Sequence, residues 1–84
     1  MNLESLRQTI DQIDDDMMVL FKRRMAVSQQ IGEVKKELNL PVFDPSREQI
    51  ILEKRRAALQ DDRLWPFYES FLKHVFHLSK EQQR

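Results

Sequence analysis

The chain has 84 residues, which allows for one domain. Its 14 basic and 14 acidic residues cancel, and this balance argues against a nucleic-acid-binding or polybasic membrane-surface protein. The sequence has no cysteine for disulfides or thiolate chemistry, and no apolar run near the ~20 residues of a membrane span. Because the N-terminus also lacks the basic start and apolar core of a signal peptide, we expect a cytoplasmic protein.

The first predicted element is one long helix over residues 3–38. Apolar residues recur here at alternating spacings of three and four, which is a heptad seam. At one seam position the pattern asks for an apolar side chain and the sequence supplies Arg24. Pro41 disfavours helix in the residue before it and so ends this element. At 1.5 Å per residue the helix is about 54 Å long.

Two shorter helices are predicted in the second half of the chain, over residues 45–59 and 66–83. Asp44 suits the N-cap of the first of them, and Pro45 suits its first turn. Pro66 opens the last helix, which has an apolar stripe. The pattern therefore predicts an all-α chain.

The lengths of these helices indicate that the chain does not fold alone. A compact domain of this size has a radius of gyration near ~12 Å, and two short helices cannot cover so long a seam. We expect an all-α fold with three helices per chain, one long and two shorter, as a single domain over residues 1–84 that forms an intertwined helical homodimer. The alternative is a monomeric three-helix bundle with a bent first helix.

Arg24 and Lys35 are the first candidates for a ligand site. A charge in an apolar seam is costly unless it is paired, and the acids at 14–16 lie two to three turns away. Lys35 follows Arg24 by 11 residues, so both share one helix face, with Ser28 and Ile31 between them. The functional interpretation is a pair of cations for an anionic ligand. The alternatives are a snorkelling or internally paired Arg24 and a solvated Lys35.

For two other residues of the long helix, a functional interpretation requires another segment to lie close to the helix. Gly32, the only glycine, costs about 1 kcal/mol in a helix relative to alanine, so we interpret it as a point of close approach to the backbone. Arg7 precedes Lys35 by 28 residues, about 42 Å along a straight helix, so the two cannot share a site within one chain. In an antiparallel dimer Arg7 enters the site from the second chain; otherwise it is an ordinary surface arginine.

The remaining candidates lie at the start of the second helix and at the end of the third. Arg47 lies in a first turn, where the helix terminus also attracts anions, and Asp44 and Glu48 flank it, although a cap and a first-turn acid need no function. Ser79 and Gln83 are spaced i, i+4 on the apolar face. They are either a fraying helix end, since only one residue follows Gln83, or donors that face a pocket.

The chemistry that these residues allow is limited. His74 and His77 have no cysteine or clear carboxylate beside them, so we expect no metal site. We find no nucleophile–base pair and no phosphate-binding loop. An enzyme of this kind would work by positioning and electrostatics, and its cations and neutral donors suit a small dianion.

In their order along the chain, these residues resemble the all-helical (AroQ) chorismate mutases. The resemblance extends over essentially the whole chain and rests on Arg7, Arg24, Gly32, Lys35, the segment VFDPSRE at 42–48, Ser79 and Gln83. It implies an intertwined homodimer with two identical sites, which rearranges chorismate to prephenate on the shikimate pathway to phenylalanine and tyrosine. It implies no cofactor and no metal.

The resemblance also assigns roles at the carboxylate end of the substrate. Arg24 and Arg7 of the partner subunit hold the two substrate carboxylates, and Arg47 and Ser79 line the same anion region.

At the ring and the ether oxygen, the resemblance implies that Asp44 and Glu48 position the ring hydroxyl. Lys35 and Gln83 donate to the ether oxygen, which makes them, with Arg24, the catalytic residues. Two alternatives remain: an isochorismate pyruvate-lyase, which has a similar fold and similar cations, and a non-catalytic helical dimerisation module.

Overall fold

The computed structural model describes residues 1–84 as three helices without a strand. The helices are α1 (Leu3–Glu37), α2 (Pro45–Leu59) and α3 (Trp65–Gln83), which confirms the all-α fold with one long and two shorter helices. α1 ends one residue earlier than expected, and α3 begins one residue earlier. None of the three combines the length and the apolar character needed to cross a membrane.

Local polar contacts set the ends of the helices. The side chains of Asn2 and Asp44 cap α1 and α2 and accept hydrogen bonds of 2.8 and 3.0 Å from the backbone N–H three residues further on. After these two helices the chain turns through Asn39 and Gln60, whose φ angles of 55° and 52° are left-handed. Asp61 then accepts hydrogen bonds from two backbone N–H groups just before α3. The two connections reverse the direction of the chain, so that α3 packs against both α1 and α2.

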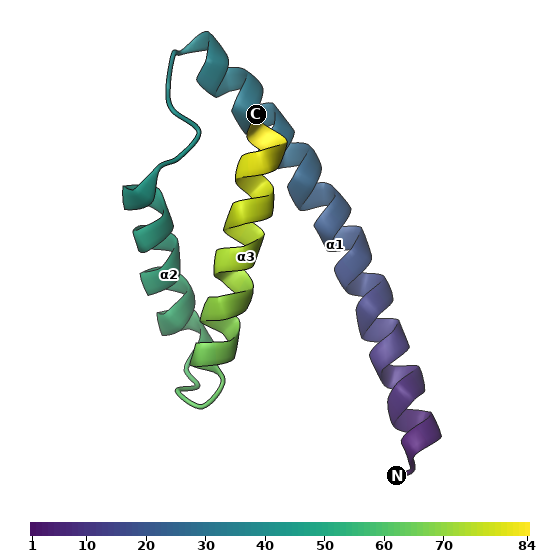
Figure 1. The fold of residues 1–84 in the computed structure, drawn as a ribbon. Helices are drawn as coiled ribbons and strands as arrows, with labels where there is room; N and C mark the ends of the chain where they lie inside the picture. Colours follow the sequence, from purple (N-terminus) through teal and green to yellow (C-terminus); the bar gives the residue numbers. More distant parts are fainter.

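α3 is the central helix of the chain. It packs against the C-terminal half of α1 on one side and against α2 on the other (Figure 1). The buried apolar core is small and consists of Trp65, Leu72 and Phe76, all from α3, with partly buried side chains of α2 packed against them. This arrangement brings the end of α1, the start of α2 and the end of α3 together.

The N-terminal half of α1 extends away from the other two helices (Figure 1). No residue before Ser28 is buried, and the seam residues Leu6, Ile13 and Met17 are each about half exposed. The radius of gyration is 15.9 Å, against ~12 Å for a compact chain of this length. An apolar stripe of this length is a surface on which another chain can pack.

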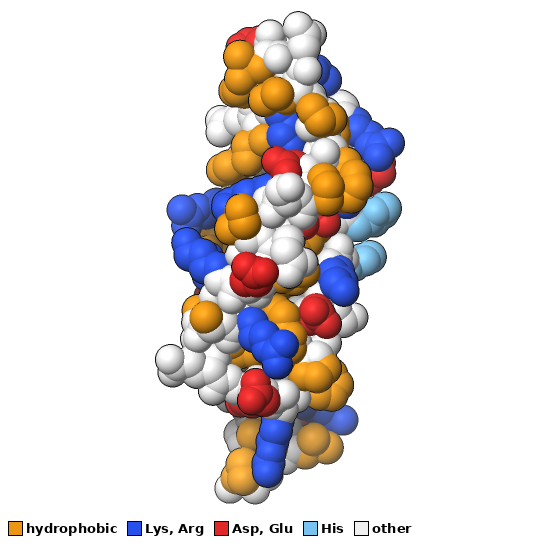
Figure 2. All heavy atoms as spheres, turned by 90° about the vertical axis from the view of Figure 1, so that its left-hand side faces the viewer, with side chains coloured by type: hydrophobic (Ala, Val, Ile, Leu, Met, Phe, Trp, Pro, Cys, Tyr) orange, Lys and Arg blue, Asp and Glu red, His pale blue; other side chains and the backbone are white.

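The outer face of α2 has a mixed character. Figure 2 shows apolar, basic and acidic side chains interspersed over this side of the molecule. No single type of side chain covers this face.

Candidate active site

A pocket of about 400 Å³ lies where the three helices meet. Its walls contain seven of the eight residues predicted for the site: Arg24, Lys35, Asp44, Arg47, Glu48, Ser79 and Gln83. The eighth, Arg7, lies on the free half of α1 and is not part of the pocket of its own chain. The volume falls within the usual range for small-molecule sites.

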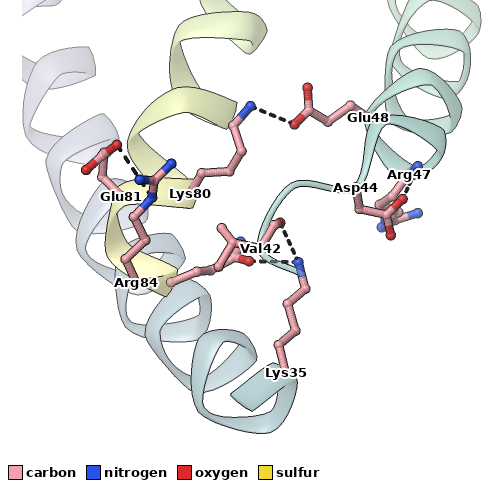
Figure 3. A network of polar contacts seen from close by, with 9 residues as sticks. Lys35, Val42, Asp44, Arg47, Glu48, Lys80, Glu81 and Arg84 are labelled. Atoms are coloured by element: carbon pink, nitrogen blue, oxygen red, sulfur yellow. Dashed lines mark hydrogen bonds and ion pairs between the residues drawn. The ribbon is translucent and has the colours of Figure 1, made fainter. Parts of the chain in front are cut away.

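Lys35 connects α1 to the segment before α2 and to the end of α3; Figure 3 shows it beside Val42. Lys35 Nζ donates to Gln83 Oε1 at 2.8 Å and to the carbonyl oxygen of Val42 at 2.9 Å. Since a lysine ammonium only donates, Gln83 turns its amide oxygen toward Lys35, and its NH₂ group remains available as a donor. Gln83 is 9% exposed and helical, so the last turn of α3 is packed in place rather than frayed.

α1 and α3 approach each other most closely around Ser28 and Gly32. The hydroxyl oxygens of Ser28 and Ser79 lie 2.6 Å apart and both residues are buried. A Cβ atom on Gly32 would stand 2.7 Å from Gln83 Cα. The close approach that the lone glycine indicated is therefore the backbone at the end of α3.

Lys80 is a pocket residue that our reading of the sequence missed. Its Nζ lies 3.0 Å from Glu48 Oε2 on α2 (Figure 3). It also lies 4.6 Å from the centre of the Phe43 ring. The side chains of Lys80 and Glu48 are only 24% and 27% exposed, so the ion pair is partly shielded from water. The only feature of the sequence that points to Lys80 is its position directly after Ser79, because no regular spacing links Lys80 to Glu48.

Of the four cations of the pocket, Arg24 and Arg47 are the two whose side chains have neither an ion pair nor a hydrogen bond within the chain. Neither forms an ion pair within the chain, and both are exposed on the pocket wall. Asp44, which is close to Arg47 in sequence, instead caps α2. The N-terminus of α2 adds partial positive charge beside Arg47. This wall of the pocket is therefore ready to bind an anion.

His74 and His77 lie outside this pocket, on an exposed part of α3, with their ring centres 6.1 Å apart. No group of three or more His, Cys, Asp or Glu side chains is arranged to hold a metal ion.

The charges of the pocket define the kind of ligand that it suits. It has four cationic and two acidic side chains, which leaves an excess of two positive charges, with hydroxyl and amide donors beside them. Small dianions with a further polar group match this set. Fold and pocket together define a small all-helical protein with a candidate site for such a molecule.

The comparisons with known proteins agree with this class. Residues 6–84 match the family model described as chorismate mutase type II, and the chain belongs to this family. It is 42% identical over 74 residues to the bifunctional chorismate mutase/prephenate dehydratase of Aquifex aeolicus, an alignment that covers 88% of this chain and 20% of that protein. With the chorismate mutase of Methanocaldococcus jannaschii it shares 33% identity over 59 residues, 70% of this chain and 60% of that one.

A solved structure is also similar. The conserved hypothetical protein from Pyrococcus furiosus matches with a TM-score of 0.71 and 40% identity, over 98% of this chain and 95% of that chain. The chain thus corresponds to a fifth of the Aquifex relative and less than two thirds of the Methanocaldococcus relative, but to nearly all of this structure.

Proposed function

We propose that the pocket rearranges chorismate to prephenate, a step toward phenylalanine and tyrosine. The observation that carries the proposal is the meeting of seven candidate residues from three helices around one pocket, in a member of the chorismate mutase type II family. Two relatives named as chorismate mutases support the same activity.

In this proposal the pocket binds chorismate through its two carboxylates. Arg24 and Arg47 form no ion pair in their own chain. Each bidentate arginine–carboxylate contact would fix both the position and the orientation of the substrate. The rearrangement is intramolecular: the ether C–O bond breaks as a C–C bond forms, so no acid, base or nucleophile is required. The pocket accelerates it by folding the enolpyruvyl arm over the ring.

Lys35 and Gln83 act on the ether oxygen in this proposal. Negative charge grows on that oxygen as the C–O bond breaks, so donors there stabilise the transition state more than the ground state. Two of the three N–H donors of Lys35 bond to Val42 and Gln83, which leaves one for the substrate. The NH₂ group of Gln83 supplies the second donor.

Asp44 and Glu48 position the ring hydroxyl in this proposal. Asp44 uses Oδ1 to cap α2, and Glu48 uses Oε2 to pair with Lys80. Because a carboxylate has two oxygens, each residue keeps one that can accept the hydroxyl proton in a hydrogen bond.

We further propose that a second copy of the chain completes each site in an intertwined homodimer. Only seven of 84 residues are buried in the single chain, and the seam on the N-terminal half of α1 is uncovered. Arg7 lies on that half, about 42 Å from Lys35 along the helix axis. Antiparallel packing of two α1 helices brings Arg7 of the partner subunit to the carboxylate end of the pocket.

The test is an assay of the purified protein with chorismate at neutral pH, in which the loss of chorismate absorbance is followed and the products are identified by chromatography. Prephenate formation that is lost in Arg24→Ala and retained in Arg55→Ala, an exposed arginine of α2 outside the pocket, would support the proposal. Pyruvate from isochorismate without efficient prephenate formation would move the assignment to a lyase. If the folded protein forms neither product, the remaining interpretation is a non-catalytic dimerisation module.

A further inference from the structure

Gly32 is needed for the space that it leaves rather than for its backbone freedom. Its φ is not positive, so any residue can adopt the helical conformation that it has in α1. Glycine within a helix is nevertheless destabilising relative to alanine. The reason for the glycine therefore lies in what a side chain would touch.

A side chain on Gly32 would meet the main chain at the end of α3. A Cβ built there lies 2.7 Å from Gln83 Cα and 2.8 Å from its carbonyl carbon, and also collides with the carbonyl oxygen. Main-chain atoms in a helix cannot rotate aside as a flexible side chain does. To reach ordinary contact distances of about 3.5–4.0 Å, the end of α3 must move by roughly 1 Å.

The residue moved by such a shift is the one that bonds to Lys35. Lys35 lies three residues after Gly32 on α1, and its Nζ reaches Gln83 Oε1 at 2.8 Å. One turn before Gly32, the contact between Ser28 and Ser79 anchors α3 to α1. With α3 held there, displacement at Gly32 falls on its last turn, and a hydrogen bond lengthened by about 1 Å is lost.

We propose that Gly32 is a positioning residue that acts through Gln83: the missing side chain lets α3 end against α1, so that the Gln83 amide meets Lys35 and presents its NH₂ group to the reacting ether oxygen. This inference rests on the chorismate rearrangement proposed above and extends it to a residue that does not touch the substrate.

The first experiment compares the kinetics of Gly32→Ala with those of Glu33→Ala, a matched change at the neighbouring exposed position of α1. Because a misplacement of 1 Å costs about 100-fold, we expect kcat of Gly32→Ala to fall about 100-fold. KM should change little, because Arg24 and Arg47 are untouched. Glu33→Ala should behave as the wild type. Unchanged kcat in Gly32→Ala would overturn the proposal.

A double-mutant cycle separates positioning from general damage to the fold. The new methyl group meets the backbone of residue 83, so Gly32→Ala should shift the melting temperature equally with Gln83 intact or replaced by alanine. Its effect on kcat should nearly disappear in the Gln83→Ala background, because the donor that it displaces is already gone. An equal loss of kcat in both backgrounds would show that Gly32 acts on the pocket in another way.

Amide hydrogen exchange tests the same inference without activity. In the wild type, the amides of residues 80–83 should exchange as slowly as those in the middle of α3, and Gly32→Ala should speed exchange only in this last turn. Rapid exchange there in the wild type would overturn the inference even if Gly32→Ala did not fold. Wild type that makes no prephenate but shows this exchange pattern would refute the proposed function and leave the packing role of Gly32 standing.

Discussion

The two halves of α1 carry the same heptad pattern but differ in what covers them. The C-terminal half, from Arg24 to Glu37, packs against α3, contains both buried residues of the helix and lines the pocket. The N-terminal half, from Leu3 to Arg23, has no buried residue and leaves its apolar seam exposed. The seam itself is no better covered in the C-terminal half, where Val27, Ile31 and Val34 are 43–52% exposed. The heptad pattern thus specifies an apolar stripe that this chain leaves exposed along the whole helix, and α3 packs beside it.

The largest expected effect comes from a change in the N-terminal half of α1 that disrupts the proposed dimer. Ile13→Glu places a charge in the seam that the proposed dimer buries, and an unpaired buried charge costs about 3–5 kcal/mol in each chain. We expect the particle mass measured by light scattering to fall from two chains of 10.2 kDa to one, with loss of activity. Gln12→Glu adds the same charge beside the seam and should leave the dimer intact. A Ile13→Glu variant that remains a dimer would contradict this.

The next largest effect comes from a change in the C-terminal half of α1, which lines the pocket. Lys35→Ala removes a donor aimed at the proposed ether oxygen, and loss of one such donor lowers kcat by about 100–1,000-fold. The steady-state rate of prephenate formation measures it. Lys54→Ala, an exposed lysine of α2 outside the pocket, is the control and should keep full activity. A Lys35→Ala variant with near-normal kcat would refute the role of Lys35 while leaving the dimer untested.

Gln83→Glu makes the second proposed donor to the ether oxygen, which lies at the end of α3, depend on pH. The introduced carboxyl donates only when protonated, and its ordinary pKa is about 4.3. The ammonium of Lys35 favours the ionised form and so lowers the pKa of the introduced carboxyl further. Activity should therefore be lost near neutral pH and rise as the pH falls, which a profile of kcat/KM against pH measures relative to the wild type. Full activity of the variant at about pH 8 would exclude a donor role.

The smallest expected effect concerns the far wall of the pocket. Lys80→Met removes the partner of Glu48, and a partly exposed ion pair contributes about 0.2–1 kcal/mol, which corresponds to a rise in KM of up to about fivefold. kcat should change less than KM. Lys73→Met, at an exposed position of α3 outside the pocket, is the matched control. Equal KM values for the two variants would show that Lys80 does not hold Glu48 for the substrate.

The parts of the candidate site that could be predicted from periodicity and capping are those whose residues lie close together in the sequence. The 11-residue spacing of Arg24 and Lys35 follows from the period of the helix, and both line the pocket. Asp44 lies three residues before Arg47, and the predicted cap appears in the structure as a hydrogen bond of 3.0 Å from the Arg47 backbone N–H to Asp44 Oδ1. The pairing of Lys80 with Glu48 could not be predicted, because it depends on how two helices are rotated about their axes.

The sequence by itself determined the three helices, their caps and the face on which the cations lie, because helical periodicity and capping act over a few residues. Only the tertiary structure decided which groups meet across helices. The contacts of Ser28 with Ser79 and of Lys35 with Gln83 join residues 51 and 48 positions apart. Such contacts depend on the crossing of α1 and α3, which is set by side-chain packing and by the space left at Gly32.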